Sequence, residues 1–191
     1  MRIITGKAKG LKLKSPKGMA TRPTSDRIKE SLFSILNGMI DFNGKKILDL
    51  FAGTGALALE ALSRGGAHAV FIDSDTVKII SENVNNAKFV NESEIIRSDV
   101  FKALNKFANS QRQFDIIFCD PPYNKGLWQR VLTEVDNLNL LTADGLLIIE
   151  HGADEVNEIK LCNIEPLRQI KYGHTTAIEI YATKNAGVTD A

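Results

Sequence analysis

The sequence predicts an α/β fold built on a mostly parallel sheet. Short apolar runs rich in β-branched residues alternate with stretches whose apolar residues recur at helical spacing. This alternation is typical of strands connected by helices that cover both faces of a parallel sheet. The last two apolar runs are separated only by a short turn, which can join only antiparallel neighbours. We therefore expect a parallel sheet with an antiparallel hairpin at its C-terminal end.

The elements follow in order along the chain. The first helix is expected to have its N-cap at Thr24 or Ser25 and to end between Gly38 and Asn43. Strands are expected at residues 46–50, 69–73, 94–98, 115–119 and 146–150, with helices at 56–64, 76–86, 100–109 and 127–135 between them. The closing strands are expected at 166–172 and 176–183, around Gly173 and His174.

The chain of 191 residues has the length of one domain with a small appendage. We expect residues 1–23 to form a basic N-terminal segment, in which RIITG and LKLKS fold as a hairpin or as an ordered arm. Residues 24–191 are expected to form the main domain, with a leading helix at 24–43 and the sheet core at 44–185. Residues from 185 onward are expected to fray.

Charge is distributed unevenly along the chain. Residues 1–30 carry nine Lys or Arg against two acidic residues, which gives +7, whereas the remainder carries −6. Such segregation indicates a surface for a polyanion, although a solvated basic tail would have the same composition.

Other classes of protein are disfavoured by what the sequence lacks. No apolar run approaches the roughly 18 residues of a membrane helix, and MRIITGKAKG has no signal-peptide core, so the expected location is the cytoplasm. Cys119 and Cys162 stand far apart and the three histidines are scattered, so we expect neither a disulfide nor a metal site.

The stretch DLFAGTGALALEAL, which starts at Asp49, has the form of a glycine-rich turn from strand to helix. Such turns let a ligand approach the backbone at the positive end of a helix. Gly53, Gly55 and the later Asp73 fit either NAD or S-adenosylmethionine, whose ribose an acid at this distance would bind. Asp49 favours S-adenosylmethionine, because a carboxylate there would repel a pyrophosphate but attract an ammonium and a sulfonium. Asp49 and Asp73 could instead serve the turns themselves, and Asp99 could bind adenine or cap the next helix.

A second unusual loop is FCDPPYNKG, where the fourth strand ends on Asp120. In an open parallel sheet ligands gather at the carboxyl ends of strands, so we expect this loop to adjoin the first. The Asp120 carboxylate and the carbonyl of Pro121 can accept both N–H groups of a nucleobase amine and so release its lone pair for attack. Tyr123 can stack on a base that has left its helix. Cys119 is better explained as a buried core thiol than as a nucleophile.

Together the segments MRIITGKAKGLKL, RPTSDRIKESLFSIL, LDLFAGTGALALEALSRG and FCDPPYNKG resemble the RsmD family of bacterial 16S ribosomal RNA guanine-N2 methyltransferases. The similarity extends through KYGHTTAIEIY near the C-terminus. The resemblance implies a class I Rossmann-like fold with a seven-stranded sheet, S-adenosylmethionine as cofactor, and a guanine in 16S rRNA of the small ribosomal subunit, or of its assembly intermediate, as acceptor. A monomer is expected.

The resemblance and the residue patterns together predict the site residues. The catalytic residues are expected to be Asp120, Pro121, Pro122 and Tyr123. The cofactor residues are expected to be Asp49, Phe51, Gly53, Thr54, Gly55, Asp73, Ser74, Asp99 and Val100. The RNA-binding residues are expected to be Lys7, Lys9, Lys12, Lys14, Arg22, Thr24 and Arg27.

Three other functions compete with this prediction. An adenine-N6 methyltransferase acting on DNA or RNA would use the same acceptor chemistry, because DPPY is shared with DNA adenine methyltransferases. A nucleic-acid-binding module could keep the fold without catalysis. An NAD-dependent oxidoreductase is the fourth possibility, and it fits Asp49 poorly.

Overall fold

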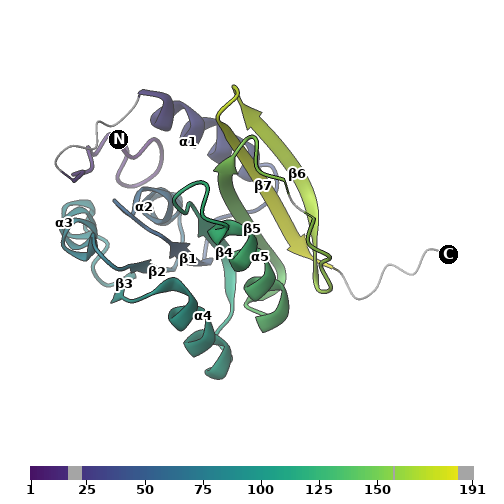
Figure 1. Ribbon diagram of the computed structural model, residues 1–191. Coiled ribbons are helices and arrows are strands. Elements are labelled where there is room, and N and C mark those ends of the chain that lie inside the picture. The colour runs from purple at the N-terminus through teal and green to yellow at the C-terminus, as the bar shows by residue number, and fades with distance from the viewer. Residues whose placement is uncertain (17–22, 157, 185–191) are drawn as a thin grey trace. The chain divides into compact units, whose positions relative to one another are not determined.

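The computed structural model describes residues 1–16, 23–156 and 158–184. The chain divides into two compact units, residues 1–100 and 101–191. Figure 1 labels the helices and strands of both. The predicted fraying from residue 185 and the predicted contact at Arg22 lie outside the described residues.

The first unit contains three helices and three parallel strands within its described part. Its elements are α1 (Pro23–Leu36), β1 (Lys46–Leu50), α2 (Ala56–Ser63), β2 (His68–Asp73), α3 (Val77–Ala87) and β3 (Ser93–Arg97). The strands lie in the order β3-β2-β1, with Asp49 opposite Phe71 and Asp73 opposite Arg97. Helix α2 packs on β1 and β2, and α3 packs on β3. The apolar residues of β1 and β2 are buried on both faces, as the continuous apolar runs predict.

The second unit contains two helices and four strands in its described part. Its elements are α4 (Val100–Asn109, which begins at the boundary), β4 (Phe114–Cys119), α5 (Leu127–Leu138), β5 (Leu141–Gly152), β6 (Ile164–Tyr172) and β7 (Thr176–Thr183). Strands β4 and β5 are parallel, whereas β7 runs antiparallel to both β5 and β6. The predicted antiparallel hairpin is therefore confirmed, and it is the yellow pair of arrows in Figure 1.

Several predicted boundaries need correction: α5 ends at Leu138 and not at residue 135, and β6 begins at Ile164 and not at residue 166. Helix α1 begins at Pro23 and ends at Leu36, so it starts before the predicted cap and stops short of the predicted end. A proline fits the first helical turn, because its fixed φ suits a helix and its missing N–H is not needed there. Strand β5 begins at Leu141 and not at residue 146, because the turn-like TADG lies within the strand at an irregularity of the β4–β5 register.

The two strand-like pieces of the N-terminal arm pair with each other over a short length: the Ile3 N–H donates to the Leu11 carbonyl at 2.9 Å, and the Leu13 N–H donates to the Met1 carbonyl at 3.0 Å. The described residues of the arm form one isolated antiparallel bridge, between Arg2 and Lys12. Backbone groups that a ladder would use bind α2 instead: the N–H groups of Ile4 and Thr5 donate to the carboxylate of Glu60. The arm is therefore held by the first unit more than by its own strands.

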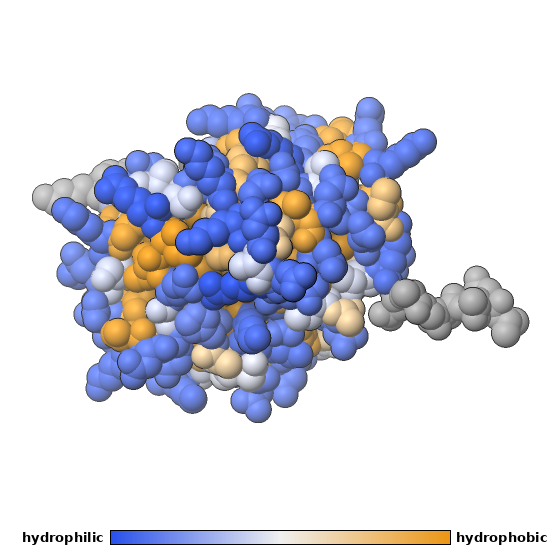
Figure 2. Space-filling model, turned by 90° about the horizontal axis from the view of Figure 1, so that it is seen from below, coloured by the Kyte–Doolittle hydropathy of each residue, from blue (hydrophilic) through white to orange (hydrophobic). Residues whose placement is uncertain are grey.

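No helix in the described part of the chain is long and apolar enough to cross a membrane. The face of the molecule in Figure 2 is mostly hydrophilic, with apolar areas between the hydrophilic side chains.

Candidate functional site

The glycine-rich turn occupies residues 51–55, between β1 and α2. Phe51, Gly53 and Gly55 have φ values of 57°, 56° and 76°, in the left-handed region that favours glycine. A Cβ atom at Gly55 would lie 3.0 Å from the Phe71 ring, so this position has little room for a side chain. The turn lies directly before the N-terminus of α2, where a nucleotide-type ligand would bind, and its Gly53 is half-buried whereas Gly55 is buried.

Asp73 holds this turn in place from the end of β2. One carboxylate oxygen accepts the Gly53 N–H at 2.9 Å, and the other accepts the N–H groups of Asp75 and Thr76, both at 2.8 Å. Burial alone would raise the pKa of Asp73, but these hydrogen bonds to the ionised form outweigh it and lower the pKa. A charged Asp73 therefore joins the carboxyl ends of β1 and β2.

Asp49 is nearly inaccessible, with 2% of its surface exposed. Its Oδ2 accepts the Ala58 N–H of α2 at 3.2 Å. Burial raises the pKa of Asp49 to about 8, and the nearby charge of Asp73 acts in the same direction. A buried acid with this pKa would gain from a cationic partner, so the site fits a ligand that carries an ammonium or sulfonium group and not an anionic pyrophosphate.

The burial of Asp49 predicts a pH-dependent stability of the cofactor-free protein. The unfolded carboxyl ionises near pH 4, whereas the folded one keeps its proton until about pH 8. The folded state therefore binds more protons between these values, and the free energy of unfolding is expected to fall there by up to about 1.4 kcal/mol per pH unit. Urea unfolding at pH 5, 6, 7 and 8 should show a flatter profile for Asp49→Asn. Parallel profiles for Asp49→Asn and the exposed control Asp75→Asn would contradict the raised pKa.

The other predicted cofactor residues lie at the same edge of the first unit. Ser74 follows β2 and is exposed, and its hydroxyl donates to Asp75 at 2.6 Å. Asp99 is exposed in the loop after β3, directly before α4. Val100 is buried, with 4% of its surface exposed. Since β1, β2 and β3 are parallel neighbours, the structure brings the acids that follow them to one edge.

The DPPY loop lies in the second unit, where it follows β4. Asp120 is exposed, Pro121 is buried and Pro122 is exposed. The Tyr123 hydroxyl donates to Oε1 of Glu150 at 2.6 Å. Burial, followed by this hydrogen bond, raises the pKa of Tyr123, so the phenol stays protonated. The ring of Tyr123 is thus held at one end by a carboxyl group of β5, and Cys119 is buried as predicted.

Sequence reasoning missed the residues that support this loop. Glu155 accepts the Asn124 N–H at 3.1 Å and also the indole N–H of Trp128. Trp128 is buried, and its ring stacks on His151 with 4.3 Å between centroids. Glu150 ends the predicted fifth strand, and an acid at the carboxyl end of a parallel strand was the available signal. No local pattern marks Glu155, because its partners come from a different part of the chain.

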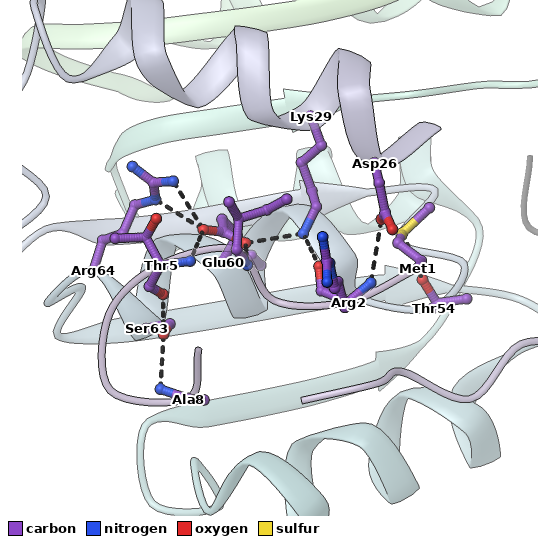
Figure 3. A network of polar contacts seen from close by, with 12 residues as sticks. Met1, Arg2, Thr5, Ala8, Asp26, Lys29, Thr54, Glu60, Ser63 and Arg64 are labelled. Atoms are coloured by element: carbon purple, nitrogen blue, oxygen red, sulfur yellow. Dashed lines mark hydrogen bonds and ion pairs between the residues drawn. The ribbon is translucent and has the colours of Figure 1, made fainter. Parts of the chain in front are cut away.

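The N-terminal arm is anchored by a buried charge cluster, shown in Figure 3. Glu60 of α2 is fully buried. Its carboxylate forms ion pairs with Nζ of Lys29 and with Nη2 of Arg64, both at 2.9 Å. It also accepts the N–H groups of Ile4 and Thr5, at 2.7 and 3.0 Å. Burial lowers the pKa of Lys29, although Glu60 opposes this shift. Lys29 therefore takes part in a buried ion pair, and its charge does not contribute to the basic surface.

The predicted RNA-binding residues fall into three groups. Lys7, Lys9, Lys12 and Arg27 are exposed. Lys14 is also exposed but pairs with Glu82 of α3 at 2.8 Å, so it is partly neutralised. Arg22 and the side chain of Thr24 lie outside the described residues.

Among residues 1–16, 23–156 and 158–184, no group of three or more His, Cys, Asp or Glu side chains could hold a metal ion.

The family described as conserved hypothetical protein 95 matches residues 1–182. The chain belongs to this family. Proteins named ribosomal RNA small subunit methyltransferase D are among the relatives of this chain. This family is therefore the one that the sequence segments resemble.

Three curated relatives are similar over most of the chain. YlbH of Bacillus subtilis, described as a candidate rRNA methyltransferase, is 36% identical and is covered over 98% of its length by 95% of this chain. Ribosomal RNA small subunit methyltransferase D of Escherichia coli is 30% identical, with 100% of this chain matching 94% of that protein. The protein of the same name from Haemophilus influenzae is 33% identical, with 81% and 80% covered.

Solved structures agree with this assignment. YhhF of Escherichia coli, described as a candidate methyltransferase, has a TM-score of 0.81 and 29% identity, with 97% of this chain and 98% of that chain covered. The Thermus protein TTHA0928 has a TM-score of 0.80 and 28% identity, with 96% and 99% covered. SMU.776, solved with S-adenosylhomocysteine (SAH), has a TM-score of 0.60 and 16% identity, with 82% and 48% covered, a level that shows the fold alone. The predicted α/β methyltransferase fold is confirmed, and the chain is a methyltransferase.

Proposed function

We propose that the chain transfers a methyl group from S-adenosylmethionine to the exocyclic N2 amine of a guanine in 16S ribosomal RNA. The substrate is the small ribosomal subunit or its assembly intermediate, and the enzyme acts as a cytoplasmic monomer. Three relatives that match most of the chain support this assignment, because their names call them rRNA methyltransferases.

Residues of the first unit would bind the cofactor. S-adenosylmethionine supplies an electrophilic methyl group on a sulfonium when it is bound. Asp49 would face its cationic groups, Asp73 would bind the ribose, and the half-buried backbone at Gly53 would lie against the ligand, while Gly55 would shape the turn. The buried Asp49 favours this cofactor over NAD, because a cation beside it would stabilise its ionised form, whereas a pyrophosphate would oppose its ionisation further.

The acceptor half is assigned to the DPPY loop of the second unit, and the observation that carries it is the exposed carboxylate of Asp120 at the end of β4. The amine of a nucleobase is a poor nucleophile, since its lone pair is delocalised into the ring. Asp120 and the Pro121 carbonyl would accept its two N–H groups and stabilise the charge that develops during attack. Tyr123, held by Glu150, would stack on the flipped base. Transfer is direct, with no covalent enzyme intermediate, and positioning supplies most of the catalysis.

The test uses labelled S-adenosylmethionine and small subunits from cells that lack the protein, followed by nucleoside analysis. Label in N2-methylguanosine is the expected result. Label in N6-methyladenosine, or label in duplex DNA alone, would mean that the amine chemistry was assigned correctly and the acceptor wrongly. Cofactor binding without transfer to any nucleic acid would favour a non-catalytic module.

The arm lysines are expected to contribute to RNA binding through phosphate contacts. Neutralising Lys7, Lys9 and Lys12 to alanine should weaken RNA binding and reduce the slope of log K against log salt by up to about 2 to 3, because each lost phosphate contact removes about 0.7 to 0.9. The measurement is RNA affinity from about 50 to 300 mM salt. The matched control neutralises Lys78, Lys160 and Lys171, which are exposed outside the arm. Equal slopes in the two triple variants would exclude the arm as the RNA-binding surface.

A further inference from the structure

Two residues of the arm, Met1 and Lys14, connect it to the cofactor turn. Met1 contacts the turn itself, and Lys14 binds Asn83, which binds the turn. At one end, the hydroxyl of Thr54 donates to Sδ of Met1 at 3.8 Å, and Figure 3 shows these side chains next to each other. At the other end, the Lys14 N–H donates to Oδ1 of Asn83 at 2.7 Å. Thr54 lies between Gly53 and Gly55, so the arm touches the segment assigned to the cofactor.

Asn83 of α3 is the residue that joins these parts. It is fully buried, and its Nδ2 donates both to the Lys14 carbonyl at 3.0 Å and to the Thr54 carbonyl at 2.9 Å. Its one amide group thus binds the arm twice and the cofactor turn once. A buried amide that lost these partners would pay a desolvation cost, so the three contacts tend to form or break together.

We propose that Asn83 is a positioning residue that makes the N-terminal arm part of the cofactor site, so that cofactor and RNA bind cooperatively. The RNA half of this inference rests on the proposed function. The turn at 51–55 contains two glycines, so its conformation depends on the hydrogen bonds that Asp73 and Asn83 make to it. A cofactor that fixes Thr54 would also fix Asn83 and, through it, Lys14. RNA bound to the arm lysines would in turn fix the cofactor turn. Thermodynamic linkage requires that the cofactor raise the RNA affinity by the same factor as RNA raises the cofactor affinity.

The first test compares Asn83→Ala with Asn85→Ala in calorimetric titrations with SAH. Asn85 is an exposed amide of the same helix that bonds only its own turn in the described structure, through the Ser81 carbonyl at 2.8 Å. Asn83→Ala is expected to weaken binding about 5- to 10-fold, and Asn85→Ala less than twofold. Unchanged SAH affinity in a folded Asn83→Ala protein would overturn the proposal.

A second pair of variants perturbs the arm without touching Asn83 or the turn. Gly6 and Gly10 have nearly equal φ values, +85° and +86°, so alanine strains the backbone equally at both. A Cβ at Gly6 would lie 1.8 Å from the Ser63 carbonyl of α2, whereas nothing lies within 4 Å at Gly10. Gly6→Ala should therefore displace the arm and weaken SAH binding several-fold more than Gly10→Ala. Equal affinities would mean that the arm does not support the cofactor site.

The third measurement separates coupling from a merely structural role. The affinity for small subunits is measured with and without saturating SAH, in the wild-type protein and in Asn83→Ala. The wild type is expected to bind at least about fivefold more tightly with SAH, and the ratio should approach 1 in the variant. An equal ratio in both proteins would refute the coupling even if methylation proceeds. If the wild type binds no subunits, the proposed function fails together with the RNA half, while the SAH titrations still decide whether the arm supports the cofactor site.

Discussion

Replacing Asp120 with alanine is expected to lower the rate of methyl transfer by about 100- to 1000-fold while SAH affinity stays within about twofold. The carboxylate would act on the acceptor amine in the transition state, and removing one such preorganised acceptor costs about this much. Single-turnover transfer to small subunits measures the first quantity, and calorimetry with SAH measures the second.

Two further variants sharpen this result. Asp120→Asn keeps an acceptor oxygen without the charge, so its rate should lie between those of the wild type and Asp120→Ala. Asp154→Ala removes another exposed acid that follows a strand of the same unit, and it should leave the rate within about twofold. Equal loss of rate and of SAH affinity in Asp120→Ala would contradict the role of Asp120 at the acceptor amine.

The largest loss of stability is expected from Glu60→Ala. Its carboxylate accepts hydrogen bonds from Lys29, Arg64 and two N–H groups of the arm, all at 3.0 Å or less. The variant would leave Lys29, which is 3% exposed, as a buried charge without its carboxylate. Breaking a buried pair in this way costs about 3 to 5 kcal/mol. Urea unfolding measures the loss, provided that the purified variant is folded at zero denaturant.

The matched control for Glu60 is Glu82→Ala. Glu82 also pairs with a lysine of the arm region, Lys14, but both side chains are more than half exposed. An exposed pair contributes about 0 to 1 kcal/mol, so this variant should unfold almost as the wild type does. If both variants lost the same free energy of unfolding, the Glu60 cluster would not anchor the arm. Expression without a folded product for Glu60→Ala alone would support the larger cost.

Most elements were predictable because their signal is local. The closing strand at 176–183 and the helix at 100–109 were predicted at their observed bounds, since alternating or helical apolar spacing ends there in turn residues. The prediction failed at TADG, where Gly145 and Asp144 read as a turn but lie within β5. It was incomplete in the arm, where the two strand-like pieces pair over a short length but the N–H groups of Ile4 and Thr5 bind Glu60. Both cases concern backbone partners that are distant along the chain.

The candidate site was predictable to a similar extent. The glycines of the first turn and the acids at the strand ends are recognisable, because parallel strands place their carboxyl ends at one edge. The supports were not recognisable: Glu155 holds Asn124 and Trp128, and Asn83 holds Lys14 and Thr54. A lone Glu or Asn in a loop or helix has no pattern that distinguishes it from a solvated residue.

The sequence by itself determined the fold class, the family and the residue types that chemistry needs, because periodicity, glycine turns and acid placement act over a few neighbouring residues. Only the tertiary structure decided that Lys29 is internal, that Asp49 is buried and carries a raised pKa, and that the arm is bonded to the cofactor turn through Asn83. The physical reason is that burial and hydrogen-bond partnership depend on which distant segments meet. The same lysine or asparagine is a surface residue in one packing and a buried junction in another.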